Sequence, residues 1–465
     1  MSTTRTITIA GAEVTYRGSV GEIEVGDGTG GPGARYVYTE YVREDLPESE
    51  RTTRPVLFAF NGGPGSSSVW THLGIGPRRV AEADSLRPPM SPPFSLVDNE
   101  DSPLDAMDLV FIDPPGTGYS RIRDGVETER FFGVEQDAGA TLEFIGHWVR
   151  RNRREQSPRF IAGESYGTLR AARVARLANG GPFHGGRTRP TSISGALVLG
   201  PAFGLGETAW SGDVEAALSL PTLVRTARHH GAAVAESDDE LAQFAREQLL
   251  PALASGTTLT DQARSDIAAR IAGLLGLPVS QILARDLRVS AAEFAKLVLA
   301  DRGLHVGMYD SRFTLASAAA GVDPVADDPG MGVYMPQFTG VIERYLRDEL
   351  HYETDDEYRS IDFRITMQHW DYDGQRMPQS NCFGEFAEVL RRDERFELLI
   401  AVGDYDLVTT REAAAFALTR FRFDRDRVHL RTYASGHMPY LGAAPRRQLG
   451  SDIRAFVLKV AGSAR

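Results

Sequence analysis

The sequence has a single cysteine, Cys382, so it cannot form a disulfide bond within one chain. Small secreted scaffolds that depend on several disulfides are therefore excluded. No run approaches the roughly 18 consecutive apolar residues of a membrane-spanning helix. Residues 1–18 alternate Thr, Ile and Val with polar side chains, without the basic start and apolar stretch of a secretory signal. These absences predict a cytoplasmic protein with no membrane partner.

Lysine is also scarce, because Lys296 and Lys459 are the only lysines among 51 Lys and Arg residues. We attribute this preference for arginine to genomic base composition rather than to chemistry. Asp and Glu together number 63, which gives a formal net charge of −12. This balance argues against nucleic acid or an anionic membrane as a main partner.

A Gly-Glu-Ser-Tyr-Gly motif at residues 163–167 lies between an apolar, strand-like run, residues 159–162, and a helical stretch, residues 169–178. A nucleophile elbow needs this strand–turn–helix setting, because the glycines let the backbone turn sharply and expose the serine hydroxyl. The pentapeptide alone is a weak signal, and its setting strengthens it. Ser165 is therefore the candidate nucleophile, with an ordinary turn serine as the alternative.

Two later strand-like runs are each followed by side chains suited to acid–base chemistry. The apolar run 397–402 precedes Asp404 and Asp406, and the run 428–433 precedes His437. The order Ser, Asp, His is that of the α/β-hydrolase triad. Of the ten histidines, His437 alone follows a late strand after the acid, which makes it the candidate general base. The strand pattern leaves both aspartates open as its partner.

A glycine-rich loop, Asn-Gly-Gly-Pro-Gly-Ser-Ser-Ser at residues 61–68, follows the apolar run 56–60. Such a loop can bring backbone N–H groups close to a substrate oxyanion. It lacks the Gly-Lys-Ser/Thr ending of a P-loop, which excludes a phosphate-cradling role. We predict an oxyanion hole formed by the amides of Gly63 and of Tyr166, the residue after the nucleophile.

The order of strands and helices predicts an α/β-hydrolase fold with an inserted, mainly helical cap. Residues 4–17 and 34–44 alternate with period two and predict an antiparallel hairpin at a sheet edge. Between residues 54 and 205, strands alternate with helices, which is typical of a mostly parallel central sheet flanked by helices. Helical spacing then prevails, and strands resume only near residue 397.

This pattern predicts three segments: a first part of the core, a cap over the mouth of the site, and a second part of the core that carries the acid and the histidine. They cover residues 1–205, 206–372 and 373–465. Four helices are expected in the middle segment, at residues 214–230, 238–253, 261–275 and 291–299.

The motifs resemble those of the serine carboxypeptidase family. The matching segments are residues 61–68, residues 111–120 (Phe-Ile-Asp-Pro-Pro-Gly-Thr-Gly-Tyr-Ser), the elbow at 163–167, Gly-Asp-x-Asp at 403–406 and Gly-His-Met at 436–438. The likeness covers residues from about 54 to 205 and from about 375 to 445. Secreted and vacuolar members usually carry several disulfides, so this chain is more similar to the cysteine-poor bacterial branch.

The resemblance implies a serine-type carboxypeptidase that hydrolyses C-terminal peptide bonds through an acyl-enzyme on Ser165. It points to Asp406 as the acid that supports His437, and it implies no cofactor and no metal. The partner would be a peptide with a free C-terminal carboxylate. Two other functions stay open: an esterase or acyltransferase with the same triad, and a non-catalytic binding protein. Monomer and homodimer are both open.

The resemblance also implies a site for the substrate's C-terminal carboxylate, formed by Asn61, Gly62 and Glu164. The family adds a tryptophan and a second glutamate, but Ala59 and Gly74 stand at those positions here. Two close carboxyls share a proton, which lets one of them donate a hydrogen bond to a carboxylate at acidic pH. With Glu164 alone, we expect substrate binding to depend less on acid.

Arg78 and Arg79 follow this region and offer a replacement for the missing glutamate. Either guanidinium could pair with the substrate carboxylate. The alternative is that both are solvated surface arginines, and we favour it.

Overall fold

The apolar runs and alternating stretches of the sequence form one large mixed sheet in the computed structural model. The structure describes residues 2–26, 31–180, 191–203, 211–319, 321, 323, 325–364, 369–372 and 382–462. Ten strands of this part join in the order β1-β2-β3-β7-β4-β9-β10-β13-β14, with β8 paired to β3. The six strands from β7 to β14 are parallel, and the pairs from β1 to β7 are antiparallel.

The strands are short in the parallel part and long in the antiparallel part. They are β1 (Ser2–Ile9), β2 (Ala12–Gly26), β3 (Pro32–Arg43), β4 (Val56–Phe60), β5 (Arg78–Val80), β6 (Leu96–Asp98), β7 (Asp108–Ile112), β8 (Arg121–Ile122), β9 (Arg159–Glu164), β10 (Gly195–Leu199), β11 (Leu304–Val306), β12 (Thr314–Ala316), β13 (Glu397–Gly403) and β14 (Val428–Tyr433). Every residue of β4, β7, β9, β10 and β13 is buried. Strands covered on both faces read as continuous apolar runs, which is why the sequence predicts them well.

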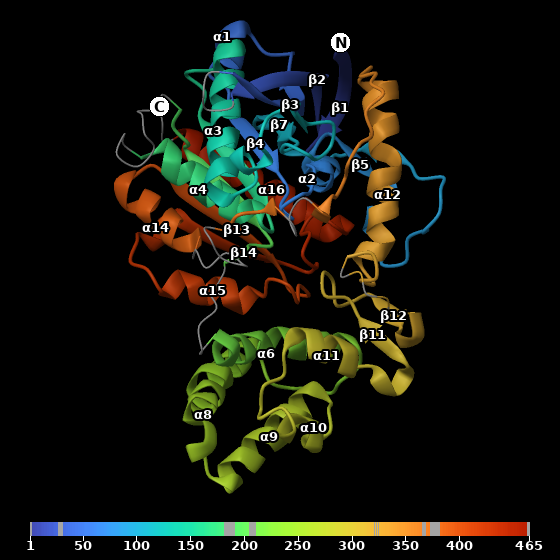
Figure 1. Ribbon diagram of the computed structural model, residues 1–465, viewed down its shortest axis with the longest axis vertical. Helices are drawn as coiled ribbons and strands as arrows, with labels where there is room; N and C mark the ends of the chain where they lie inside the picture. The colour runs from blue at the N-terminus through green and yellow to red at the C-terminus, as the bar shows by residue number, and fades with distance from the viewer. Residues whose placement is uncertain are drawn as a thin grey trace.

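Helices cover both faces of this sheet (Figure 1). The helices are α1 (Glu48–Arg51), α2 (Val69–Ile75), α3 (Val134–Arg151), α4 (Gly167–Ala178), α6 (Ser211–His229), α7 (Asp238–Phe244), α8 (Leu250–Ser255), α9 (Asp261–Leu275), α10 (Val279–Leu283), α11 (Ala291–Leu297), α12 (Met331–Arg344), α14 (Cys382–Arg392), α15 (Arg411–Thr419) and α16 (Ala443–Gly462). Leu57 and Ala59 pack with α2, α12 and α16, whereas Phe58 and Phe60 pack with α3, α4 and α14. The alternation of side chains along β4 thus supplies both apolar layers.

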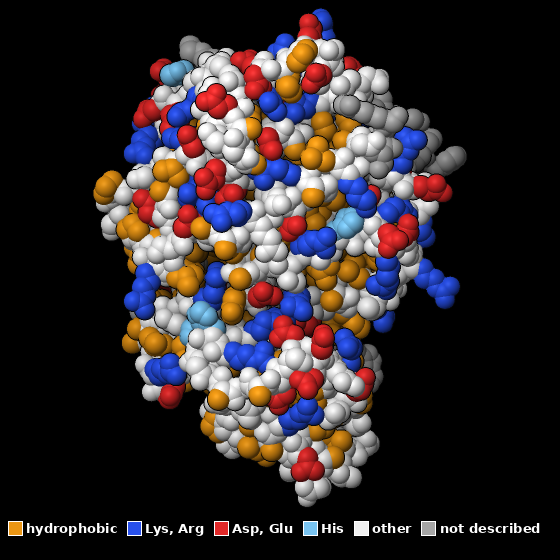
Figure 2. Space-filling view, turned by 180° about the vertical axis from the view of Figure 1, so that it is seen from behind, with side chains coloured by type: hydrophobic (Ala, Val, Ile, Leu, Met, Phe, Trp, Pro, Cys, Tyr) orange, Lys and Arg blue, Asp and Glu red, His pale blue; other side chains and the backbone are white. Residues whose placement is uncertain are grey.

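Helices α6 to α11 have an apolar core of their own, separate from the two layers on the sheet. They lie below the sheet in Figure 1, and Figure 2 shows the molecule narrowing above this part. Two of these helices begin with a reciprocal capping box: Ser237 with Glu240 at α7, and Ser290 with Glu293 at α11. The helical character expected for this segment follows from these local signals and from its apolar spacing.

The fold class is confirmed, and three details differ from the expectation. The run 4–17 contains a turn at Ala10 and Gly11, so it forms β1 and the start of β2. The run 238–253 is divided into α7, a π-helical turn η4 (Ala245–Leu249) and α8. The middle segment also contains the two-stranded sheet of β11 and β12 before residue 397. These strands have three residues each, too few for a period-two pattern to stand out.

The division into three segments stays a prediction. Its boundary at residues 205 and 206 lies outside the described residues, and its boundary after residue 372 borders on another such stretch. The described helices include none that is long and apolar enough to cross a bilayer. On the face shown in Figure 2, acidic and basic side chains are interspersed.

Candidate active site

Ser165 occupies the sharp turn between β9 and α4. Its φ is +57°, a left-handed conformation that costs a non-glycine residue free energy and is held by its surroundings. Its amide donates to the carbonyl of Leu199 at 3.0 Å, which ties the turn to β10. A Cβ atom at Gly163 would lie 2.0 Å from the carbonyl oxygen of Gly167. Glycine is therefore required at 163, and the partly exposed serine lies at the carboxyl edge of the sheet.

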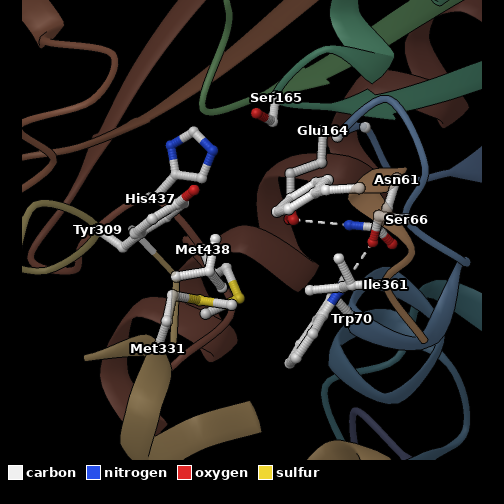
Figure 3. Close-up of a pocket in the computed structure, with 14 residues that line it drawn as sticks. Asn61, Ser66, Trp70, Glu164, Ser165, Tyr309, Met331, Ile361, His437 and Met438 are labelled. Atoms are coloured by element: carbon white, nitrogen blue, oxygen red, sulfur yellow. Dashed lines mark hydrogen bonds between the residues drawn. The ribbon is translucent and has the colours of Figure 1, made fainter. Parts of the chain in front are cut away.

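His437 and Asp406 meet at the same edge, beyond the ends of the parallel strands β14 and β13. Nδ1 of His437 lies 2.7 Å from Oδ2 of Asp406, and both side chains are buried. Nε2 of His437 is buried too, and it has no hydrogen-bond partner among the described residues. Ser165 and His437 line one pocket, where the hydroxyl and the imidazole face the same space (Figure 3).

The carboxylate of Asp406 is held firmly by the turn that follows it. Oδ1 accepts hydrogen bonds from the amides of Val408 and Thr409 at 2.8 and 2.9 Å, and Oδ2 accepts one from the Thr409 hydroxyl. Asp404 instead points to Arg411, with 3.5 Å between Oδ1 and Nη1. Of the two aspartates that the strand pattern left open, the structure therefore places Asp406 against His437.

Two opposing effects set the proton affinity of His437. Burial lowers its pKa, but the carboxylate of Asp406, with Glu164 adding to it, raises the pKa above the usual 6.5. The imidazolium that forms during proton transfer is thus stabilised by its acidic neighbours.

The glycine-rich loop after β4 lies directly against the elbow. A Cβ atom at Gly62 would be 2.5 Å from the amide nitrogen of Tyr166, so only glycine allows this approach. Gly63 has a φ of +101° and lines the pocket together with Ser165. Within the part of the chain that the structure describes, neither the Gly63 nor the Tyr166 amide donates a hydrogen bond. Two free amides beside a serine hydroxyl are suited to binding an oxyanion.

Asn61 and Glu164 form the opposite side of the pocket from His437. Nδ2 of Asn61 donates to Oε1 of Glu164 at 2.6 Å. The amide orientation is set by Thr71, whose backbone N–H and hydroxyl both donate to Oδ1 of Asn61. Burial raises the pKa of Glu164 to about 7, partly offset by His437, by the neighbouring Tyr440 hydroxyl and by the hydrogen bond from Asn61. Near neutral pH this carboxyl can therefore hold a proton and donate it in a hydrogen bond.

The other walls of the pocket are mostly apolar. They are formed by Ser66, Trp70, Tyr309, Val325, Met331, Ile361, Phe363 and Met438. Sequence reasoning assigned none of them to the site: Ser66 and Met438 stand in the quoted motifs without a role there, and the others belong to no recognisable motif. Five of them fall within residues 206–372, the segment predicted as a cap.

Arg78 and Arg79 do not line this pocket. Arg78 pairs with Asp98 at 2.6 Å and with Glu349 at 3.0 Å, and Arg79 pairs with Asp84 at 3.2 Å. Their side chains are only 11% and 16% exposed, so the favoured interpretation of both as solvated surface arginines is wrong: ion pairs hold them in the fold. Among the described residues, His, Cys, Asp and Glu form no group of three or more that could hold a metal ion.

Comparisons with known proteins agree with this geometry. Residues 36–176 match the family model described as serine carboxypeptidase. No curated protein sequence matches the chain. Among solved structures, a prohormone-processing carboxypeptidase from Saccharomyces cerevisiae is similar with a TM-score of 0.59 and 15% identity, covering 96% of this chain and 91% of that one. This likeness concerns the fold.

Two other solved structures match with lower scores. A proline iminopeptidase from Mycobacterium smegmatis has a TM-score of 0.40 and 12% identity over 96% of this chain and 100% of that one. A juvenile hormone epoxide hydrolase from the silkworm Bombyx mori has a TM-score of 0.41 and 10% identity over 97% and 80%. The matched residues 36–176 contain the glycine-rich loop and the elbow with Ser165 at the centre of this pocket, and over this part the chain is similar to the serine carboxypeptidase family.

Proposed function

We propose that the protein is a serine-type carboxypeptidase that removes C-terminal residues from peptides through an acyl-enzyme on Ser165. One observation carries this proposal: Asn61 and Glu164 stand in the same pocket as Ser165 and His437. In this arrangement the nucleophile and the base lie beside a site for the terminal carboxylate of a peptide. A carboxylate bound there would place the last peptide bond next to the serine, so that this bond is the one hydrolysed.

In the proposed mechanism, the Ser165 hydroxyl attacks the carbonyl carbon of the last peptide bond while Nε2 of His437 accepts its proton. The amides of Gly63 and Tyr166 donate hydrogen bonds to the oxyanion of the tetrahedral intermediate. The C–N bond then breaks, and His437 delivers its proton to the leaving amine. Water, deprotonated by the same imidazole, hydrolyses the acyl-enzyme and regenerates Ser165.

Glu164 and Asn61 hold the substrate's carboxylate in this proposal. Protonated Glu164 donates one hydrogen bond to it, and the second N–H of the Asn61 amide donates another. Thr71 keeps the Asn61 amide in the orientation that makes this N–H available. The apolar walls, including Trp70 and Met438, surround the neighbouring side chains of the peptide.

The proposal is tested with three blocked substrates that share one acyl group: a dipeptide with a free carboxylate, its C-terminal amide, and a simple ester. We expect kcat/KM to be highest for the free acid. Efficient turnover of the ester with no preference for the free carboxylate would favour an esterase or acyltransferase. Failure of a fluorophosphonate to label Ser165 would favour a non-catalytic binding protein.

Activity should follow a bell-shaped pH profile with its maximum near pH 7. His437 must be neutral to accept the serine proton, and its raised pKa places the acid limb above 6.5. Glu164 must keep its proton to bind the carboxylate, so KM should rise as pH passes its pKa of about 7. The measurement is kcat/KM against pH on the free-acid dipeptide. An optimum at pH 4 to 5 would contradict this assignment of the two groups.

A further inference from the structure

Tyr440 lies behind the carboxylate side of the pocket, three residues after His437. Its side chain is 1% exposed, and its ring covers Gly74 of helix α2. A Cβ atom at Gly74 would lie 2.4 Å from the ring, a distance that real side chains do not reach. The Tyr440 ring can therefore occupy this position only because residue 74 has no side chain.

The hydroxyl of Tyr440 reaches the buried pair of Glu164 and Asn61. It acts on the pKa of Glu164 as a hydrogen-bonding neighbour, although its geometry falls short of a well-formed hydrogen bond. Oε2 of Glu164 and the Tyr440 hydroxyl are both buried without a well-formed hydrogen bond in the described part of the chain. Buried polar atoms are ordinarily satisfied, and leaving one unpaired is costly. The Tyr440 hydroxyl is therefore an available hydrogen-bond partner for Oε2 of Glu164.

The other neighbours of Glu164 leave Tyr440 as the partner for its second carboxyl oxygen. Oε1 is already bonded to Asn61 at 2.6 Å. The charged groups that act on the carboxyl are His437, from the segment after β14, and Asp406, from the segment after β13. Both already hydrogen-bond to each other at 2.7 Å. Tyr440 is thus the neutral hydroxyl group that acts on the Glu164 carboxyl.

We propose that Tyr440 is a positioning residue, whose hydroxyl holds Oε2 of Glu164 so that this carboxyl is presented to the C-terminal carboxylate of the substrate. The role rests on the proposed carboxypeptidase function. Burial keeps the phenol of Tyr440 neutral well beyond the usual pKa of 10. Of Glu164 and Tyr440, only Glu164 then changes its protonation near neutral pH. Gly74 is required because a side chain at this position would exclude the Tyr440 ring.

The test is Tyr440→Phe, which keeps the ring over Gly74 and removes the hydroxyl. For the free-acid dipeptide, KM should rise about tenfold with little change in kcat, because the lost hydrogen bond serves substrate and transition state alike. The hydroxyl lowers the pKa of Glu164, so the alkaline limb of the profile should shift to higher pH in the variant. Kinetics with the C-terminal amide should hardly change.

The matched control is Tyr16→Phe. Tyr16 is equally buried, and its hydroxyl also lacks a hydrogen-bond partner among the described residues, but it lies in β2. Its loss should leave both KM and the pH profile unchanged. An increase of KM for the free acid and the amide alike in Tyr440→Phe would show a merely structural role and overturn the proposal.

A second variant, Gly74→Ala, tests the same role without removing the hydroxyl. The added methyl group must displace the Tyr440 ring, so KM for the free acid should rise and the alkaline limb should move as in Tyr440→Phe. If KM and the pH profile stayed unchanged in both variants, the positioning role of Tyr440 would be overturned, while the proposed carboxypeptidase function would stand. If the wild-type enzyme showed no preference for the free acid over the amide, the proposed function would fail, and this inference with it.

Discussion

Replacing Ser165 with alanine is expected to lower kcat by a factor on the order of a million. The variant loses the nucleophile, while the oxyanion amides and the carboxylate site keep a small residual rate. The turn should survive the change, because alanine is no larger than serine and the position is held by the Leu199 hydrogen bond to its backbone. The measurement is kcat on the free-acid dipeptide, together with the melting temperature.

A suitable control is Ser219→Ala, the same substitution at a buried serine of α6 that does not line the pocket. It should leave kcat close to that of the wild-type enzyme. Near-normal activity of Ser165→Ala would rule out the acyl-enzyme on this residue.

The second large effect is expected for Asp406→Asn, which should lower kcat about ten-thousandfold. Oδ1 of Asp406 accepts two backbone N–H groups, so an asparagine side chain would place its oxygen there and its NH₂ group toward His437. Nδ1 of the imidazole would then have to accept a hydrogen bond, which puts the ring proton on Nε2. A histidine in that tautomer cannot take the proton of Ser165.

Asp404→Asn is the matched comparison, since the two aspartates are two residues apart and follow the same strand. Its carboxylate is 3.5 Å from Arg411 and makes no contact with His437, so we expect less than a tenfold loss of kcat. Should Asp404→Asn prove the more damaging change at equal thermal stability, the acid of the triad would have to be reassigned.

The parallel part of the sheet could be predicted almost residue by residue. The runs 56–60 and 428–433 coincide with β4 and β14, and the run 397–402 covers all but the last residue of β13. Strands covered on both faces, such as β4 and β13, are bounded apolar runs. The turn between β1 and β2 could not be predicted in this way, since the alternation of residues 4–17 continues across Ala10 and Gly11. Side-chain period alone does not show where a strand reverses.

The same distinction holds for the candidate site. Ser165, His437 and Gly63 depend on backbone turns that leave glycine motifs in the sequence, and the structure places them around one pocket. The contact between Tyr440 and Gly74 joins residues 366 positions apart and depends on the volume of a single side chain. In the sequence, Gly74 shows only that residue 74 has no side chain where the family has a glutamate. What fills its place becomes visible only in three dimensions.

The scarcity of lysine has a practical consequence for measurements in solution. Lys296 lies exposed on α11, in the group of helices with its own apolar core, and Lys459 lies on α16, beside the sheet. Apart from the α-amino group, fluorophores that react with amines would therefore attach to one lysine in each part of the molecule. Resonance energy transfer between the two dyes, recorded while a blocked dipeptide is added to the Ser165→Ala protein, would report how the separation of the two parts responds to occupancy of the pocket.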